Sequence, residues 1–270
     1  MTWPTSWSTD IRDHLDRYPY LHSRLKRGRG LGWDGKYAPW IKVRNVKDGD
    51  GRTTHVRGIR IDRVHHVLSR HERSYLYLAE RWPWVTDIRE QWPILDPDRT
   101  NELHYARGIP IPHRGGFPQP PTIDFMLTET TEKGTLCRAV AIKHAVNRGR
   151  KKSQLYLDVQ RAWCEENGIV FTVVDNVGDK TLCNTLSFMR NWFVDQYKAP
   201  QDKLSDFSDR FNRQHRSNTS LKDLLRPIES ALQIDQAEAL SLLSLCAWEN
   251  RIRLDLARPI GMQDIVYLAT

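Results

Sequence analysis

The stretch that decides the fold is PPTIDFMLTETTEKGTLCRAVAIKHAVNRGRKK, residues 120–152. Two apolar runs, TIDFML and LCRAVAIKHA, flank a polar loop that ends in Gly134, which is the pattern of a β-hairpin. The first run contains Asp124 and the second contains Lys143. Because an isolated charge is costly to bury, charges on paired strands are expected to face each other, a ligand or a metal. The sequence therefore predicts a site at Asp124 and Lys143.

The elements predicted around this hairpin complete an α/β domain. Upstream, the sequence predicts a helix over residues 69–82, a strand over 84–95 interrupted by the charged sequence REQ, and a strand or short helix over 101–112. Downstream, a helix over 153–167 ends at Asn167-Gly168, and the run over 169–175 predicts a fully buried strand. This order of helix, strands, hairpin, helix and strand is typical of a compact α/β unit.

The chain changes character towards its C-terminus. After a helix over 180–197, three further helices and two short strands are predicted, in the layout of a winged helix. The last predicted helix has almost no basic side chains, which a recognition helix in a major groove would carry, so protein docking is favoured over DNA reading. The ranges are 204–214, 220–233 and 235–251 for the helices, and 252–256 and 264–269 for the strands.

Composition indicates a soluble globular protein, long enough for one large domain or two of ordinary size, and the order of elements favours two, residues 1–178 and 179–270. Its 270 residues are 39% hydrophobic, enough for a substantial core. The apolar runs are about half the ~20 residues that a membrane span needs, and the N-terminus lacks the apolar centre of a signal peptide. The four cysteines form no C-x-x-C pair, so neither a zinc ribbon nor a disulfide framework is indicated. We therefore expect a cytoplasmic protein with reduced thiols.

The positive charge is concentrated in one segment. The formal net charge is +8, and residues 24–70 hold thirteen Lys or Arg against four Asp. Basic residues alternate there with aromatic residues and glycines, a composition suited to contact with a phosphate backbone. The alternative is a solvated, irregular extension containing a short hairpin whose turn is the DGDG sequence at 48–51. A second basic cluster follows Lys143.

Glu72 has two interpretations. Ser69 followed by Glu72 matches a capping box, in which the carboxylate satisfies backbone donors at the helix start and needs no catalytic role. Alternatively, Glu72 joins Asp124 and Lys143. Two carboxylates and a lysine have the chemistry of a metal-dependent phosphodiesterase, because Mg²⁺ prefers oxygen ligands and a lysine can orient water or stabilise phosphate charge.

Longer segments carry a family resemblance. HHVLSRHERSYLYLAERWPWVTDIREQWPIL, TNELHYARGIPIP, PTIDFML and AVAIKHA resemble the TnsA endonucleases of heteromeric cut-and-paste transposons, over roughly residues 36–175. DIREQWPIL, with the upstream LSRHE, is the most specific part. The resemblance implies a restriction-endonuclease-like (PD-(D/E)xK) N-terminal domain and a winged-helix-like C-terminal domain. It also implies Mg²⁺-dependent cleavage of the 5′ strands at transposon ends, in a bacterial protein that is nucleoid-associated during transposition.

The resemblance also implies partners and site residues. The partners are double-stranded DNA at the transposon ends, a DDE transposase that cuts and joins the 3′ ends, and an AAA+ ATPase regulator that docks on the C-terminal domain. By position, Glu72, Asp124 and Lys143 match the family's two acids and lysine, with one or two Mg²⁺ held by both carboxylates and the backbone carbonyl of Ile142. We expect DNA contacts from basic residues at Arg24, Lys26, Arg27, Arg29, Lys42, Arg44, Arg148, Arg150, Lys151 and Lys152.

One position departs from the family pattern. The family's Q/E-x-K element is Ala141-Ile142-Lys143 here, and an alanine side chain cannot coordinate a metal. Asp158 and Gln160 stand where the family places glutamates, although a solvent-facing Asp158 fits the pattern equally well. His144 is expected to point away from the site, because side chains alternate along a strand.

Three functions are compatible with these patterns. The first is a Mg²⁺-dependent endonuclease subunit of a transposase. The second is a DNA-binding adaptor that links the transposase to the ATPase regulator, with a site impaired by the loss at Ala141. The third is a stand-alone restriction-type nuclease, against which the helical C-terminal domain argues.

Overall fold

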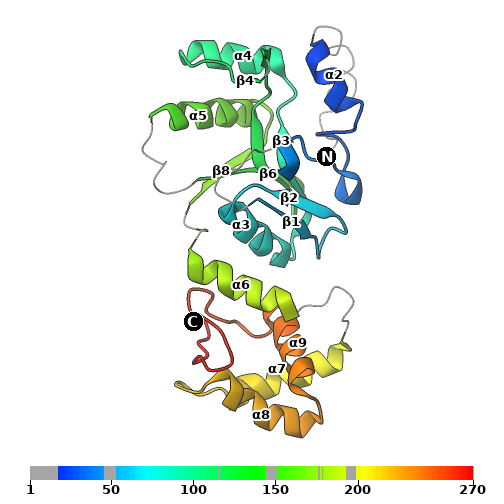
Figure 1. Cartoon of the computed structure of the whole chain (residues 1–270), viewed down its shortest axis with the longest axis vertical. Helices are drawn as coiled ribbons and strands as arrows, with labels where there is room; N and C mark the ends of the chain where they lie inside the picture. Colours follow the sequence, from blue (N-terminus) through cyan, green and yellow to red (C-terminus); the bar gives the residue numbers. More distant parts are fainter. Residues whose placement is uncertain are drawn as a thin grey trace. The chain divides into compact units, whose positions relative to one another are not determined.

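The computed structural model describes residues 18–45, 53–114, 116–143, 151–175, 177, 179–192 and 199–269. The chain divides into two compact units, Met1–Asn176 and Val177–Thr270, and most of their elements are labelled in Figure 1. Unit 1 is built on a mixed β-sheet with helices, and unit 2 is built mainly from helices. The predicted α/β class is therefore confirmed.

A four-stranded sheet forms the centre of unit 1, in the order β3-β6-β7-β8. The first three strands are antiparallel, and β8 pairs parallel to β7. The predicted hairpin is confirmed as β6 and β7, but its connection is only Glu132 and Lys133, much shorter than the expected polar loop. Threonines tolerate the extended backbone well, so both strands continue into that sequence. The strands are β3 (Val85–Pro93), β6 (Thr122–Thr131), β7 (Gly134–Ile142) and β8 (Val170–Val174).

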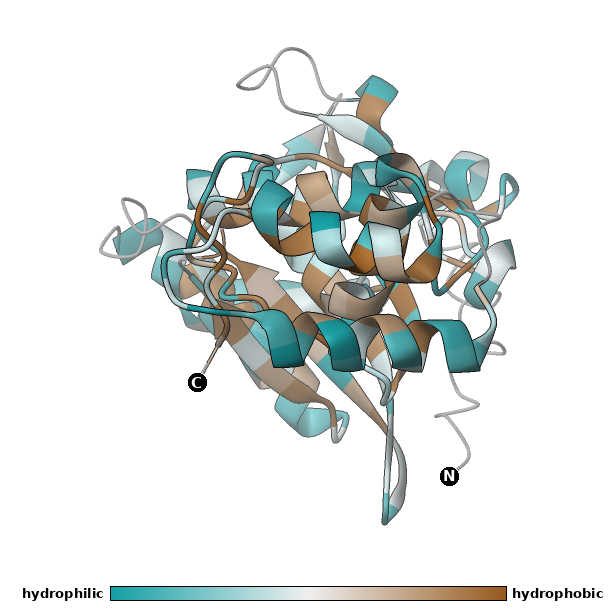
Figure 2. Cartoon of the chain, turned by 90° about the horizontal axis from the view of Figure 1, so that it is seen from below, coloured by the Kyte–Doolittle hydropathy of each residue, from teal (hydrophilic) through white to brown (hydrophobic). Residues whose placement is uncertain are grey.

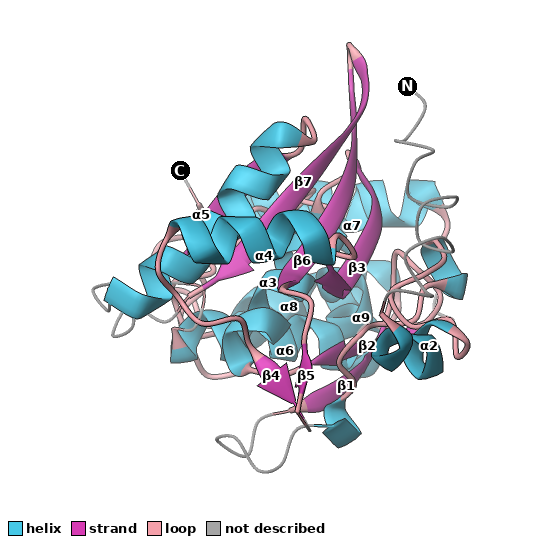
Figure 3. Ribbon diagram, turned by 90° about the horizontal axis from the view of Figure 1, so that it is seen from above, coloured by secondary structure: helices cyan, strands magenta, loops and turns pink. Residues whose placement is uncertain are grey.

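Helices cover both faces of this sheet. Helix α3 (Arg70–Arg81) lies on one face, and α4 (Pro97–Ala106) and α5 (Lys151–Glu166) lie on the other (Figures 1 and 3). The α4 segment, predicted as a strand or short helix, is helical because Asp96 caps its N-terminus and Pro97 suits the first helical turn. Trp92 packs against Trp163 in the core between the sheet and α5, with ring centroids 6.0 Å apart.

The prediction that residues 169–175 form a fully buried strand is wrong. Strand β8 lies at the edge of the sheet, Val170 is 43% exposed and the other four residues are only half-buried. A continuous apolar run predicts a strand covered on both faces, but an edge position leaves part of each side chain accessible.

A second, smaller hairpin lies beside the main sheet. Strand β1 (Thr54–Arg57) pairs with β2 (Val64–Val67), and Gly58 N donates to Arg63 O at 2.8 Å where the turn begins. The predicted hairpin around the DGDG turn is therefore wrong in position: that sequence lies outside the described residues, and the segment before it ends in a 3₁₀ turn, η2 (Val43–Asn45), rather than a strand.

Short elements complete unit 1. Helix α2 (Pro19–Leu25) buries Leu21 and Leu25. The 3₁₀ turn η1 (Asp34–Lys36) follows, and β4 (His113–Arg114) pairs with β5 (Phe117–Pro118).

Unit 2 consists of helices around a buried central helix, and the predicted helices are confirmed. They are α6 (Lys180–Trp192), α7 (Gln201–Gln214), α8 (Leu221–Leu232) and α9 (Gln236–Trp248). The alternation of hydrophilic and hydrophobic residues along the outer helices is visible in Figure 2. Helix α9 differs, because every residue from Ala239 to Trp248 is buried. Its lack of basic residues therefore reflects a core position, and the argument from that helix to protein docking was wrong.

The two predicted C-terminal strands do not form as strands in the described part of unit 2. A single bridge joins Leu254 to Leu268. Two hydrogen bonds flank this bridge, from Asp255 N to Tyr267 O at 2.9 Å and from Ala269 N to Arg253 O at 2.7 Å, while Val266 N donates to Thr219 O at 3.1 Å in the segment preceding α8. The winged-helix layout stays a prediction. Across both units, no described helix combines the length and apolar content needed to cross a membrane.

Candidate active site

Asp124 and Lys143 meet at one end of the β6–β7 pair. Asp124 lies near the start of β6, and its Oδ2 accepts a hydrogen bond from Ile142 N at 2.6 Å. Lys143 directly follows β7, and its own backbone N donates to Val174 O at 2.9 Å. Burial raises the pKa of the Asp124 carboxyl above its usual range, although the charge of Lys143 opposes this shift. The two side chains therefore lie close enough for the charge of Lys143 to act on the carboxyl group of Asp124.

Glu72 is a capping-box residue and a neighbour of Asp124 at the same time. Ser69 Oγ accepts from Glu72 N at 3.1 Å and donates to Glu72 Oε1 at 3.0 Å, and Leu68 N donates to Oε2 at 2.8 Å. The capping interpretation is therefore confirmed. The side chain is only 8% exposed, and burial, followed by the charge of Asp124, raises the pKa of Glu72 to about 8. One carboxylate can serve both roles.

Gln91 is the residue at this site that sequence reasoning missed. It is 3% exposed on β3, and its Nε2 donates to Glu72 Oε2 at 3.2 Å. Its backbone φ is +49°, a left-handed value that is rare for a residue other than glycine. The available signals were the polar REQ sequence inside an apolar strand and its place in DIREQWPIL, the most specific part of the family resemblance, but neither indicates a contact between Gln91 and Glu72.

The remaining predicted ligands occupy the neighbouring elements. Ala141 is 1% exposed in β7 and presents only a methyl group. On α5, Asp158 is half-buried, and Gln160 Nε2 donates to Thr122 O at 2.9 Å, which ties α5 to the start of β6. The Oε1 atom of Gln160 is buried and has no hydrogen-bond partner in the described part of the chain. His144 lies outside the described residues.

The donor set suits a hard divalent cation. Glu72 and Asp124 supply carboxylate oxygens, and burial disfavours their charged forms, so a bound cation would compensate for that cost. Within the described ranges, however, no three His, Cys, Asp or Glu side chains gather as a metal-binding group. The chemistry of the two carboxylates fits a cation, while a third protein ligand would have to be a backbone or amide oxygen.

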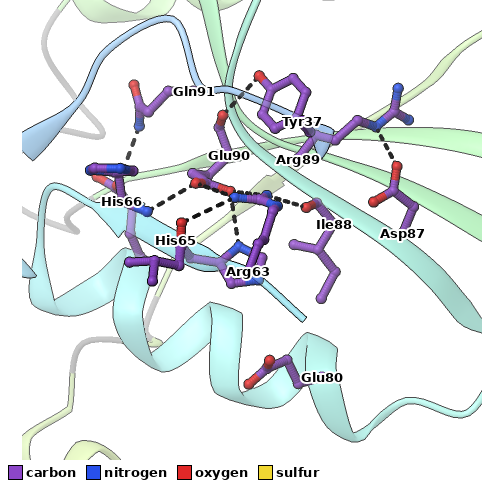
Figure 4. A network of polar contacts seen from close by, with 12 residues as sticks. Tyr37, Arg63, His65, His66, Glu80, Asp87, Ile88, Arg89, Glu90 and Gln91 are labelled. Atoms are coloured by element: carbon purple, nitrogen blue, oxygen red, sulfur yellow. Dashed lines mark hydrogen bonds and ion pairs between the residues drawn. The ribbon is translucent and has the colours of Figure 1, made fainter. Parts of the chain in front are cut away.

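A buried polar network holds the strand that carries Gln91 (Figure 4). Glu90 accepts from Arg63 Nη1 at 2.8 Å, from His66 N at 2.9 Å and shares a 2.9 Å contact with His65 Nδ1. Arg63 also donates to Ile88 O at 2.6 Å. Burial alone would raise the pKa of Glu90, but the hydrogen bonds from Arg63 and His65 outweigh it and lower the pKa. The network fixes β2 against β3.

Comparison with known proteins supports the resemblance to TnsA over part of the chain. No family model matches the chain. The TnsA transposition protein of transposon Tn7 from Escherichia coli is 36% identical over 104 residues, which are 38% of this chain. Over that stretch the chain is TnsA-like. It spans 37% of the length of that curated relative, little more than a third.

The basic residues predicted to contact DNA differ in their exposure to solvent. Lys26, Arg27 and Arg44 are exposed, as are Lys151 and Lys152 at the start of α5. The guanidinium of Arg24 lies over the ring of Trp40 at 4.7 Å, and Lys42 is half-buried. Arg148 and Arg150 lie outside the described residues.

The prediction that Arg29 contacts DNA is wrong. The residue is 5% exposed, and its Nη1 donates to Trp40 O at 3.2 Å and to Asn45 Oδ1 at 2.8 Å. A guanidinium held by these internal acceptors stabilises the N-terminal segment and is not available to a phosphate.

Proposed function

We propose that the protein is a DNA endonuclease that cleaves the 5′ strands at transposon ends, together with a DDE transposase. The observation that carries the proposal is the meeting of two carboxyl groups, the buried Glu72 and the half-buried Asp124, beside Lys143 in a chain that is TnsA-like over 104 residues. Carboxylates and a lysine at one end of a mixed sheet also support a restriction-endonuclease-like fold for residues 1–178.

The reaction is hydrolysis of a phosphodiester. Glu72, Asp124 and the Ile142 carbonyl would hold one or two Mg²⁺, and the bound cation would neutralise phosphate charge and favour deprotonation of water. Lys143 would orient the attacking water or stabilise negative charge on the phosphate. The water oxygen forms a bond to phosphorus while the bond to the leaving oxygen breaks, and that oxygen takes up a proton.

DNA contacts are proposed for the exposed basic residues of unit 1. The sequence from residue 177 onward holds twelve Lys or Arg and twelve Asp or Glu, so the whole formal excess of +8 belongs to residues 1–176. A positive field in that unit supports attraction of a DNA duplex. For residues 179–270 we retain the proposal of a winged-helix-like domain on which an AAA+ ATPase regulator docks.

The decisive experiment is strand cleavage in a reconstituted system. The chain, the partner transposase, Mg²⁺ and a labelled transposon-end duplex are combined, and wild type is compared with Asp124→Asn and Lys143→Ala. We expect both variants to lose 5′-strand cleavage while DNA affinity stays nearly unchanged. Glu129→Gln is the matched control, because Glu129 lies on the same strand but pairs with Arg138 at its other end. Cleavage that survives Asp124→Asn would refute the catalytic assignment.

A second function is favoured by one observation, the alanine at position 141. Without a side-chain ligand there, the protein could act as a DNA-binding adaptor between transposase and ATPase. Absence of 5′-strand cleavage by wild type, with stable assembly on transposon ends, would support this alternative.

A further inference from the structure

The direction of side chains along β3 reverses at Gln91. In a regular strand, residues 90 and 92 point to the same face. Here Glu90 contacts Arg63 and His65 on the side of the β1–β2 hairpin, whereas Trp92 packs against Trp163 of α5. The left-handed backbone of Gln91, with φ +49°, accounts for this reversal.

This backbone conformation is costly and firmly held. A non-glycine residue in the left-handed region is strained, and such strain persists only where surrounding contacts determine it. Three contacts do so: Trp40 N donates to Gln91 O at 3.2 Å, Tyr37 Oη donates to Glu90 O at 3.0 Å, and the Arg63–Glu90 ion pair fixes the preceding side chain.

The result of the reversal is that Gln91 turns towards α3. Its Nε2 donates to Glu72 Oε2 at 3.2 Å, and this hydrogen bond joins that carboxylate to the central sheet. Leu68 N and Ser69 Oγ, which also donate to Glu72, belong to the segment directly before α3. The neighbouring pairs Glu90 with Phe125 and Trp92 with Ile123 also place Gln91 opposite Asp124 in the register.

We infer that Gln91 is a positioning residue, whose strained backbone directs its amide to Glu72 and so fixes that carboxylate for a divalent cation shared with Asp124. The inference rests on the proposed function only in assuming a cation at this site. It explains why β3 carries a buried amide in an unfavourable backbone conformation: the amide restricts the carboxylate of a different element to one orientation.

The test measures binding of Mn²⁺ alone to the full chain by electron paramagnetic resonance, alongside thermal unfolding without metal. Gln91→Gly removes the amide but relieves the backbone strain, and Gln91→Met keeps the side-chain size but removes the donor. We expect each variant to bind Mn²⁺ at least tenfold more weakly, the lower end of losses seen when a partner of a metal ligand is removed. Gln91→Gly should unfold at an equal or higher temperature than wild type.

Gln233→Gly is the matched control. Gln233 also has a left-handed backbone, with φ +54°, but it is the exposed C-cap of α8 in unit 2. The substitution Gln233→Gly should raise the unfolding temperature without changing Mn²⁺ affinity. If Gln91→Gly lowers the unfolding temperature, the Mn²⁺ affinity of Gln91→Met is the measurement that tests the inference.

Unchanged Mn²⁺ affinity in Gln91→Met, or no Mn²⁺ binding by wild type, overturns the inference. Strand cleavage is scored separately. Wild type that binds Mn²⁺ and never cleaves would refute the proposed function, while the Gln91 comparison would still stand.

Discussion

The charge of Asp124 on β6 contributes to a raised pKa for Glu72, a carboxyl on α3. Burial is the larger cause, and the hydrogen bonds from Leu68 N, Ser69 Oγ and Gln91 Nε2 oppose it. Two carboxyl groups from separate elements therefore lie in one poorly hydrated site, and ionisation of both lowers the stability of the metal-free fold. This cost is measurable.

The first prediction concerns stability and pH. In the fold the pKa of Glu72 is about 8, against an ordinary value of 4.5, so the folded state retains the proton more strongly. The stability from this group is fully present below pH 4.5 and is lost as pH rises towards 8. We expect Glu72→Gln to become more stable than metal-free wild type over that window, by on the order of 4 kcal/mol at pH 8.

The measurement is urea unfolding of both proteins between pH 5 and 8.5. The difference between them isolates Glu72 from other groups, such as His66, whose pKa is lowered to about 4 mainly by burial. A difference that does not grow with pH would contradict the raised pKa. A divalent cation added to wild type should reduce the difference.

The second prediction concerns the buried ion pair. Arg63→Ala leaves the Glu90 carboxylate buried without its bidentate partner, because the two side chains are 6% and 0% exposed. We expect a loss of about 3–5 kcal/mol in the free energy of unfolding. Arg57→Ala is the control: Arg57 pairs with Asp62 at 2.7 Å, but both side chains are largely exposed, so the loss should stay below about 1 kcal/mol. Equal losses in the two variants would contradict a structural role for the buried network.

The central sheet was predictable from sequence, and the arrangement of the site was predictable only in part. Alternating and continuous apolar runs locate β3, β6 and β7, and the two charges inside the hairpin mark Asp124 and Lys143. The capping signal correctly identified Glu72 but could not show that Asp124 lies nearby, because that depends on packing of α3 against the sheet. Gln91 was missed for a physical reason: its direction follows from one left-handed φ angle, and no periodic pattern encodes a reversal.

The third prediction compares exposed basic residues of unit 1 with exposed basic residues of unit 2. Lys26→Ala with Arg27→Ala should weaken binding to a transposon-end duplex and reduce the slope of log affinity against log salt by about 2, because each lost phosphate contact changes it by about 1. Lys222→Ala with Arg226→Ala, two exposed residues of the neutral unit 2, should leave the slope unchanged. Fluorescence anisotropy between 50 and 200 mM salt, about the range over which such contacts are lost, measures both. Equal slopes for the two double variants would contradict DNA contact through Lys26 and Arg27.

The last prediction tests whether α9 is a core helix. Ser244 is fully buried, and its Oγ has no hydrogen-bond partner within the residues that the structure describes. Removing an unsatisfied buried hydroxyl eliminates a desolvation cost, so Ser244→Ala should raise the free energy of unfolding by about 1 kcal/mol. Ser241→Ala on the same helix is the control, since Ser241 Oγ donates to Ala237 O at 2.9 Å and its loss brings no such gain. If α9 instead opened to receive a partner or DNA, Ser244 would be hydrated in the free protein. Chemical denaturation would then find the two variants equivalent.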